Sequence, residues 1–246
     1  VYKRQCQNFG EIEGDVNVGG IAGTMGVENL LDPEEDNKDE GTSLLRTSYT
    51  VSAVLTGNIN EGSITAKKDM VGGIVGQEEL GLVTACESYG DVTGVNQVGG
   101  IAGAASAKLR GNWAKCALSG DKYIGGIVGY AYHASLGGCT SRAGRAADYE
   151  YTQADRSRLR GRYVGGIVGS GVQENVDGSG SSVRWNYSLV DITDCQQYQG
   201  AISGSDTGTF EHNYYVSDDL PGINRQGYAG RAEPISYSQL LALSDL

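Results

Sequence analysis

The chain has 246 residues, with 39 glycines, 15 tyrosines, 3 prolines and a formal net charge of −11. The acidity makes a nucleic-acid backbone or an anionic membrane surface a poor partner, and no stretch approaches the ~20 apolar residues of a membrane-spanning helix, so we expect no membrane insertion by this segment. The glycines lack a Gly-X-Y period and are interleaved with valine and isoleucine, which excludes collagen and argues against disorder.

The first five residues, Val1–Gln5, resemble a translated sequencing-adapter remnant, and we set them aside from the fold prediction. We expect a metagenomic fragment of a longer protein. Residues 6–232 are expected to form one repeat domain, and residues 233–246 the start of a C-terminal capping helix or a linker.

A six-residue phrase recurs along the chain. Its copies are VGGIAG at Val18–Gly23, VGGIVG at Val71–Gly76, VGGIAG at Val98–Gly103, IGGIVG at Ile124–Gly129, VGGIVG at Val164–Gly169 and the degenerate QGAISG at Gln199–Gly204. The first glycines of three successive copies are Gly72, Gly99 and Gly125, so the unit has 26 or 27 residues, and longer intervals carry insertions. Such a period with strand-like apolar runs is typical of stacked repeats.

A second phrase precedes the glycine pair. Cys6–Gly14 (CQNFGEIEG) parallels Cys86–Gly94 (CESYGDVTG), so each unit contains two or three short strands. We therefore predict an all-β fold, a right-handed parallel β-helix (β-solenoid) with roughly 26-residue coils, surface loop insertions and a short C-terminal capping helix. Within the phrase, strict alternation would put Val71 and Ile74 on opposite faces, and we expect the glycine pair to bend the strand so that both reach the core.

The phrase VGGI[AV]G, preceded by C-x-x-x-G-[DE]-[VI]-x-G, resembles the GLUG-motif repeat of bacterial surface proteins, including non-catalytic parts of some immunoglobulin-A peptidases. The resemblance covers roughly Cys6 to Gly204. It implies an extracellular or cell-surface protein, typically of a host-associated bacterium. We expect a non-catalytic structural or display region of a larger protein, with an adhesive role toward a glycan or a host surface protein. The alternative is an accessory β-helix of a carbohydrate-active enzyme or peptidase whose catalytic part lies outside this segment.

Catalytic groups are sparse in the sequence. The two histidines, His133 and His212, do not form the His-Glu-x-x-His motif of zinc peptidases. Carboxylate pairs occur, but an acidic chain supplies such pairs by chance; they are Asp218 with Asp219, Asp191 with Asp194, and Asp148 with Glu150. We therefore expect no enzyme activity, no catalytic residues and no cofactor.

Three insertions are expected to be surface loops: Glu28–Gly41, Ala143–Arg162 and Gly171–Ser182. The acidic insertion 28–41 is either a solvated run of charge, which we favour, or a calcium site. The glycine that an EF-hand loop needs at its sixth position is Asn37 here. We assign no metal ligands.

Four of the five cysteines, Cys6, Cys86, Cys116 and Cys139, fall at comparable places in their units. We predict one buried ladder of reduced thiols, because in-register stacking gives poor disulfide geometry and no Cys-x-x-Cys occurs.

The tyrosines are the candidate ligand-contact residues. Tyr123, Tyr163 and Tyr198 each stand two residues before the first glycine of their copy, a position that Asn17, Met70 and Gln97 hold in other copies, and four more tyrosines lie nearby: Tyr130, Tyr132, Tyr149 and Tyr151. Exposed tyrosines can stack on sugar rings or anchor a protein partner. The other interpretation, an aromatic ladder that only stabilises the stack, stays open at this point.

Overall fold

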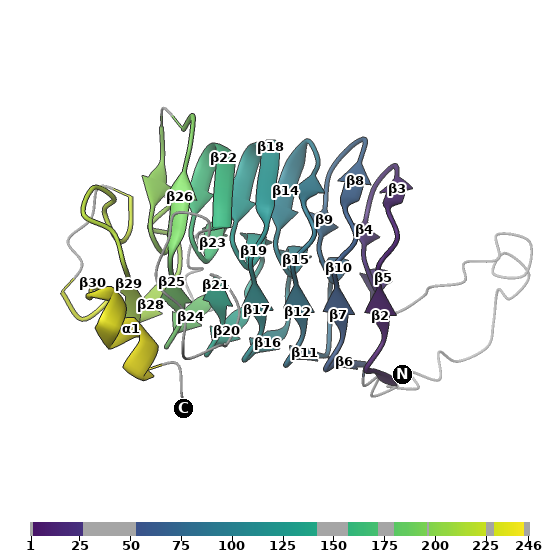
Figure 1. The fold of residues 1–246 in the computed structure, drawn as a ribbon, viewed down its shortest axis with the longest axis horizontal. Helices are drawn as coiled ribbons and strands as arrows, with labels where there is room; N and C mark the ends of the chain where they lie inside the picture. The colour runs from purple at the N-terminus through teal and green to yellow at the C-terminus, as the bar shows by residue number, and fades with distance from the viewer. Residues whose placement is uncertain are drawn as a thin grey trace, which may run out of the picture.

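The computed structural model describes residues 2–26, 53–141, 157–171, 180–195, 197–224 and 229–243. In this part of the chain the fold is all-β, with one helix of seven residues, α1 (Tyr237–Leu243). Strands of successive units lie side by side along the long axis, from β1–β5 at the N-terminal end to β29, β30 and α1 at the other (Figure 1). Two sequence predictions fall outside the described residues: the acidic segment 28–41, for which calcium binding is the alternative, and the candidate tyrosines Tyr149 and Tyr151.

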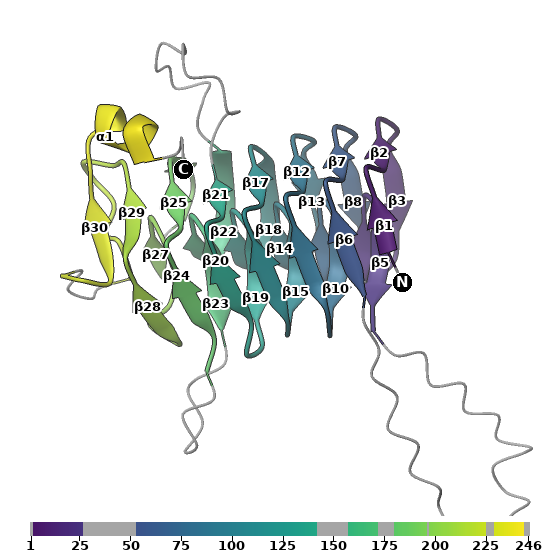
Figure 2. The ribbon, with the colours of Figure 1, turned by 90° about the horizontal axis from the view of Figure 1, so that it is seen from below.

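The strands form four parallel sheets, seen from a second side in Figure 2. The seven-stranded sheet contains β1 (Tyr2–Arg4), β6 (Val54–Thr56), β11 (Leu82–Thr84), β16 (Lys108–Arg110), β20 (Ser135–Gly137), β24 (Ser182–Arg184) and β28 (Thr209–Glu211). The eight-stranded sheet contains β2 (Gln7–Asn8), β7 (Ile59–Asn60), β12 (Glu87–Ser88), β17 (Trp113–Ala114), β21 (Thr140–Ser141), β25 (Tyr187–Ser188), β29 (Asn213–Tyr215) and β30 (Ala232–Pro234).

The five-stranded sheet contains β5 (Ala22–Met25), β10 (Val75–Glu78), β15 (Ala102–Ala105), β19 (Val128–Ala131) and β23 (Val168–Gly171). The ten-stranded sheet contains β3 (Ile12–Gly14), β4 (Val18–Gly19), β8 (Ile64–Ala66), β9 (Val71–Gly72), β13 (Val92–Thr93), β14 (Asn96–Gly99), β18 (Ala117–Gly125), β22 (Ser157–Gly165), β26 (Val190–Ile192) and β27 (Gln199–Gly200).

The predicted right-handed parallel β-helix with two or three strands per coil is wrong. The strands lie in four sheets, and the ten-stranded sheet runs from β3 through β8 and β13 to β18 and then turns back through β14, β9 and β4, an arrangement close to a closed barrel. The prediction failed in two ways. It assigned no strands at the positions of the seven-stranded sheet, such as β6 and β11, and it expected separate short strands where β18 and β22 each run on for nine residues. The structure shows a parallel all-β fold.

Equivalent positions of the recurring phrase lie in register. Val18 pairs with Val71, Val71 with Val98, Val98 with Ile124 and Ile124 with Val164. Tyr2–Arg4, which the sequence analysis set aside, form β1 and pair with Val54–Thr56.

The glycine pair bends each phrase, as the sequence predicts. Val71 lies on β9, a short strand of the ten-stranded sheet. The chain then bends at Gly73 and Ile74, and Val75 begins β10, a strand of the five-stranded sheet. Val71 and Ile74 are therefore both fully buried. A Cβ atom at Gly73 would collide with the Ser88 hydroxyl and the Gly100 carbonyl, so two backbones and a small side chain approach here too closely for any other residue.

The core is one continuous column of apolar side chains along the stack. Isoleucine of the phrase is completely buried in five copies: Ile74, Ile101, Ile127, Ile167 and Ile202. Burial of such a side chain stabilises a fold by roughly 1.5–3 kcal/mol, and each further copy adds the same contribution.

Candidate ligand-binding surface

The turn before each phrase has a left-handed backbone. The φ angles are 53° at Asn17, 61° at Met70, 58° at Gln97, 62° at Tyr123, 55° at Tyr163 and 60° at Tyr198. The turn packs against the third glycine of a neighbouring copy: a Cβ atom at Gly169 would lie 2.6 Å from the carbonyl carbon of Tyr123, and one at Gly204 equally close to that of Tyr163. The phrase therefore fixes this backbone conformation whatever side chain occupies it.

A left-handed conformation suits asparagine and glycine, but it costs other residues roughly 1–2 kcal/mol. Asn17 meets that preference, and its side-chain amide donates to Gln77 at 3.0 Å and to Thr24 at 3.1 Å. The three tyrosines do not meet it. Their presence at this position is not explained by the backbone they occupy.

Five of the seven candidate tyrosines form one cluster, which we call the tyrosine cluster. Tyr123 contacts Tyr130 edge-on with ring centroids 4.9 Å apart and Tyr163 at 5.3 Å. Tyr130 contacts Tyr132 at 4.6 Å, and Tyr163 stacks on Tyr198 at 4.2 Å with nearly parallel rings. Tyr198 is 36% exposed and the other four are partly buried. The structure therefore brings together residues that lie up to 75 positions apart.

Contacts within the tyrosine cluster use many of the ring faces. Burial, with smaller contributions from Tyr132 and Tyr123, raises the pKa of the Tyr130 hydroxyl, so this group stays protonated at neutral pH. Gln97 donates a hydrogen bond of 2.9 Å to the Tyr132 hydroxyl, which joins the cluster to the polar part of the same column. The cluster therefore offers a ligand ring edges, hydroxyl groups and the exposed part of Tyr198.

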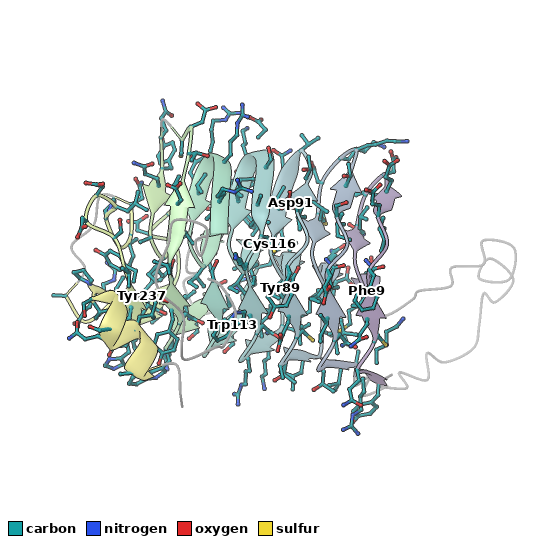
Figure 3. The ribbon with its side chains drawn as sticks, viewed as in Figure 1. Phe9, Tyr89, Asp91, Trp113, Cys116 and Tyr237 are labelled. Atoms are coloured by element: carbon teal, nitrogen blue, oxygen red, sulfur yellow. The ribbon has the colours of Figure 1, made fainter. Side chains whose placement is uncertain are left out.

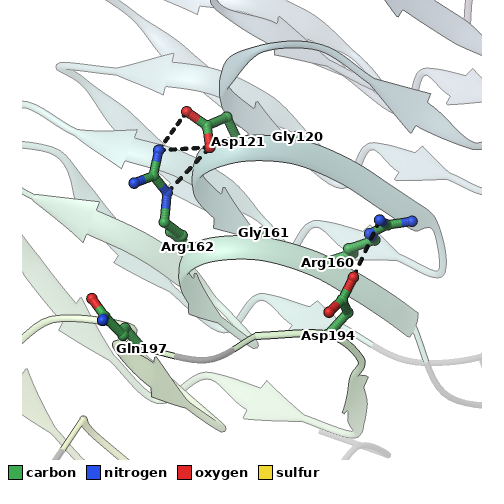
Figure 4. Close-up of a pocket in the computed structure, with 7 residues that line it drawn as sticks. All are labelled: Gly120, Asp121, Arg160, Gly161, Arg162, Asp194 and Gln197. Atoms are coloured by element: carbon green, nitrogen blue, oxygen red, sulfur yellow. Dashed lines mark hydrogen bonds and ion pairs between the residues drawn. The ribbon is translucent and has the colours of Figure 1, made fainter.

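A polar pocket of about 320 Å³ lies where β18 and β22 pair (Figure 4). Its lining residues are Gly120, Asp121, Arg160, Gly161, Arg162, Asp194 and Gln197. Arg162 and Gln197 directly precede Tyr163 and Tyr198 in the chain, so both pocket and cluster are built on the same two turns.

Two ion pairs line this pocket, one on each side of Gly161. Arg162 holds Asp121 through its Nη2 at 2.6 and 2.7 Å and through its Nε at 3.1 Å, and Arg160 contacts Asp194 at 3.2 Å. The four side chains are between 50% and 63% exposed. The pairing register of β18 and β22 shifts between Ser119 and Lys122, so two residues of β18 oppose Gly161 alone. Such a bulge re-aims the side chains beside it.

No family model, curated protein or solved structure matches this chain. Within the described ranges, no helix is long and apolar enough to cross a membrane. No three His, Cys, Asp or Glu side chains of those ranges are grouped so that they could hold a metal ion.

The cysteines do not form the single ladder that we predicted. Cys86 and Cys139 do alternate along one column with asparagines that sequence reasoning missed, whereas Cys116 lies outside it and contacts Ser88. Asn112 accepts a hydrogen bond from the Cys86 amide at 3.0 Å and donates to the Val83 carbonyl at 2.9 Å. A signal existed, because Asn112 precedes Gly125 by 13 residues, as Cys86 precedes Gly99.

The five cysteines, all within the described ranges, form no disulfide bonds. Because an asparagine lies between Cys86 and Cys139 in the column, these two cysteines are two strand spacings apart. That is about 9.6 Å, which is too far for a disulfide. Burial raises the pKa of Cys139 to about 11 and that of Cys116 to about 12, so these thiols are unreactive in the folded protein.

A buried carboxylate, Glu78, is a second feature that the sequence did not reveal. Glu78 is the last residue of β10, pairs in register with Met25 and Ala105, and is fully buried. Neither carboxylate oxygen has a hydrogen-bond partner among the described residues. Burial raises the pKa of Glu78 to about 8, so the group is mainly protonated at neutral pH.

The remaining sequence candidates lie apart from the pocket. His212 is exposed and stacks on Trp185 with ring centroids 4.3 Å apart, and His133 is exposed at another turn. Of the described carboxylate pairs, only Asp194 belongs to the pocket, as the partner of Arg160.

A second hollow, of about 410 Å³, lies beside Phe9, Tyr89 and Asp91, which Figure 3 labels. Glu11 and Glu61 also line it. Phe9 is 65% exposed, and the Tyr89 hydroxyl donates to Glu87 at 2.6 Å. The hollow is acidic and shallow.

Proposed function

We propose that this chain is a non-catalytic structural and display region of a larger secreted or cell-surface bacterial protein of the GLUG-motif type, and that its tyrosine cluster is an adhesive surface. The recurring phrase and its resemblance to that family support the first part. The observation that carries the second part is the gathering of five tyrosines at one corner, three of them in a backbone conformation that disfavours tyrosine.

The display role follows from what is constant and what varies between copies. The valine, isoleucine and glycine positions of the phrase serve core and turn geometry, and they are nearly the same in every copy. The residue before each phrase changes from Asn17, Met70 and Gln97 to three tyrosines. Side chains that vary on a constant frame can be changed without loss of the fold, which is what a display scaffold requires.

A comparison of stacking energy with backbone cost in the tyrosine cluster favours ligand binding over a purely stabilising role. A stacked or edge-on aromatic pair contributes about 0.5–1.5 kcal/mol beyond burial. The left-handed backbone costs each of Tyr123, Tyr163 and Tyr198 about the same amount or more. Stacking therefore only offsets the local cost, and the scaffold gains little net stability from tyrosine over asparagine. Met70 and Gln97 bear the same backbone cost, so it is the gathering of partly exposed rings, and not that cost alone, that a ligand explains.

The test compares the intact chain with the double variant Tyr163→Asn/Tyr198→Asn. Asparagine occupies the equivalent position at Asn17, so the variant should keep its fold, as thermal melting would verify. The control is Tyr2→Asn, because Tyr2 is 71% exposed and lies on β1, away from the cluster.

Binding would be measured on a printed glycan array and on immobilised, purified host-cell surface glycoproteins. We expect the wild-type chain and the control to bind, and the double variant to lose about tenfold or more in affinity. Absence of binding by the wild-type chain, or equal binding by the double variant, would refute the adhesive role.

A further inference from the structure

We propose that the pocket between the Asp121–Arg162 and Arg160–Asp194 pairs is a subsite for one uncharged sugar residue, so that the ligand of the adjoining tyrosine cluster is a neutral oligosaccharide. This inference rests on the proposed adhesive function and adds the chemical class of the ligand.

Charge balance in the pocket favours an uncharged ligand. Each arginine is already matched by an aspartate, at 2.6 Å for Arg162 with Asp121 and 3.2 Å for Arg160 with Asp194. A carboxylate or sulfate entering the pocket would have to displace an aspartate or lie beside it, and like charges at such distances repel. The net charge of −11 adds a long-range repulsion against polyanions.

The hydrogen-bonding groups that remain match sugar hydroxyls. A guanidinium group has five N–H donors, and Asp121 uses the Nε and Nη2 donors of Arg162, which leaves Nη1 available as far as the described residues show. Each carboxylate oxygen can accept more than one hydrogen bond. The ion pair therefore presents donors and acceptors side by side, and a pair of neighbouring hydroxyls, each both donor and acceptor, satisfies both.

The shape of the pocket fits a single ring. Its volume of about 320 Å³ is at the lower end of the range for small-molecule sites. Gly120 and Gly161 line it without side chains, and a Cβ atom at Gly161 would lie 2.6 Å from Ile124, so the backbone here lies directly on the core. The bulge at this point keeps Asp121 and Arg162 directed at each other above that floor.

The neighbouring tyrosines extend the site beyond one residue. Gln197 and Arg162 line the pocket, and Tyr198 and Tyr163 follow them in the chain and stack on each other at 4.2 Å. A sugar held by its hydroxyls in the pocket would leave its next ring beside the tyrosine cluster, where the exposed part of Tyr198 can contact apolar C–H groups and the tyrosine hydroxyls can hydrogen-bond to sugar hydroxyls. The combined surface is thus suited to an oligosaccharide.

The experiment uses the intact chain on an array of neutral oligosaccharides printed with their sialylated and sulfated counterparts. The test variants are Arg162→Gln and Asp121→Asn. Matched controls are Lys68→Gln and Asp15→Asn, because Lys68 and Asp15 form another exposed ion pair, of 2.7 Å, elsewhere on the surface. Exposed ion pairs add little stability, so all four variants should fold, as thermal melting would verify.

We expect the wild-type chain to prefer neutral oligosaccharides and to bind them equally at about 50 and about 500 mM salt, because no charge is neutralised on binding. Each test variant should lose roughly 10- to 100-fold in affinity, and the controls should lose none.

Two results would overturn the subsite while leaving the adhesive function intact. One is binding confined to sialylated or sulfated glycans, or to a protein partner. The other is a loss of binding in Tyr163→Asn/Tyr198→Asn with unchanged binding in Arg162→Gln. No binding by the wild-type chain to any probe would instead refute the adhesive function, and the subsite with it.

Discussion

Replacing Glu78 with glutamine should make the protein more stable at alkaline pH and remove most of the pH dependence of its unfolding free energy. Glutamine has nearly the same shape as glutamic acid and carries no charge at any pH. The site is fully buried, and neither carboxylate oxygen has a partner among the described residues. The ionised form of Glu78 is therefore strongly disfavoured in the folded state.

The magnitude follows from the pKa, which burial raises from 4.5 to about 8. Because the folded state holds this proton more tightly than the unfolded state does, the stabilising effect is fully present below pH 4.5. It is lost progressively as pH rises toward and through 8. This difference between the folded and unfolded pKa values lowers the free energy of unfolding by about 5 kcal/mol at high pH, at about 1.4 kcal/mol per pKa unit. The thiols of Cys139 and Cys116, with folded-state pKa values of about 11 and 12, stay protonated in the folded protein, so they lower its stability only from about pH 9 upward, where the unfolded thiols ionise.

The assay is urea unfolding followed by tryptophan fluorescence at about pH 5, 7 and 9. The control is Glu79→Gln, which changes an exposed carboxylate at the next position and should leave the pH profile unaltered. We expect wild-type stability to fall by several kcal/mol between the lowest and highest pH, and that of Glu78→Gln to fall far less. Parallel profiles for the wild type and Glu78→Gln, or a wild type that gains stability as pH rises, would refute the argument.

Three further predictions concern the packing of the core, the first two measured by urea unfolding and the third by thiol labelling. Alanine at Gly126, whose Cβ would collide with the Gly166 carbonyl, should cost about 3 kcal/mol, whereas alanine at Gly111, with open space and φ of 57°, should cost about 1 kcal/mol; equal costs would contradict the packing argument. Asn112→Ala should lose about 2–4 kcal/mol in urea unfolding because two buried backbone groups lose their partner, and a loss below about 0.5 kcal/mol would exclude that role. Cys139 should react with a thiol reagent only on unfolding, and peptide mapping that finds it labelled in the folded protein would contradict its burial.

Part of the candidate surface could be read from the sequence. The constant spacing of Tyr123, Tyr163 and Tyr198 from their glycine pairs predicts one column, and the structure stacks Tyr163 on Tyr198. The pocket could not be read in this way. Asp121 and Arg162 are 41 residues apart, and they meet only because a bulge in β18 shifts the register.

The sequence by itself determined the local features: a β fold, a bend at each glycine pair and burial of Val71 and Ile74 on both sides of it. These depend on near neighbours in the chain, namely on backbone freedom at glycine and on apolar spacing. Tertiary structure alone decided that the described strands form four sheets, and that Glu78 lies in the core with no hydrogen-bond partner among the described residues. Those outcomes depend on register between segments about 26 residues or more apart, where a shift of one residue changes every contact.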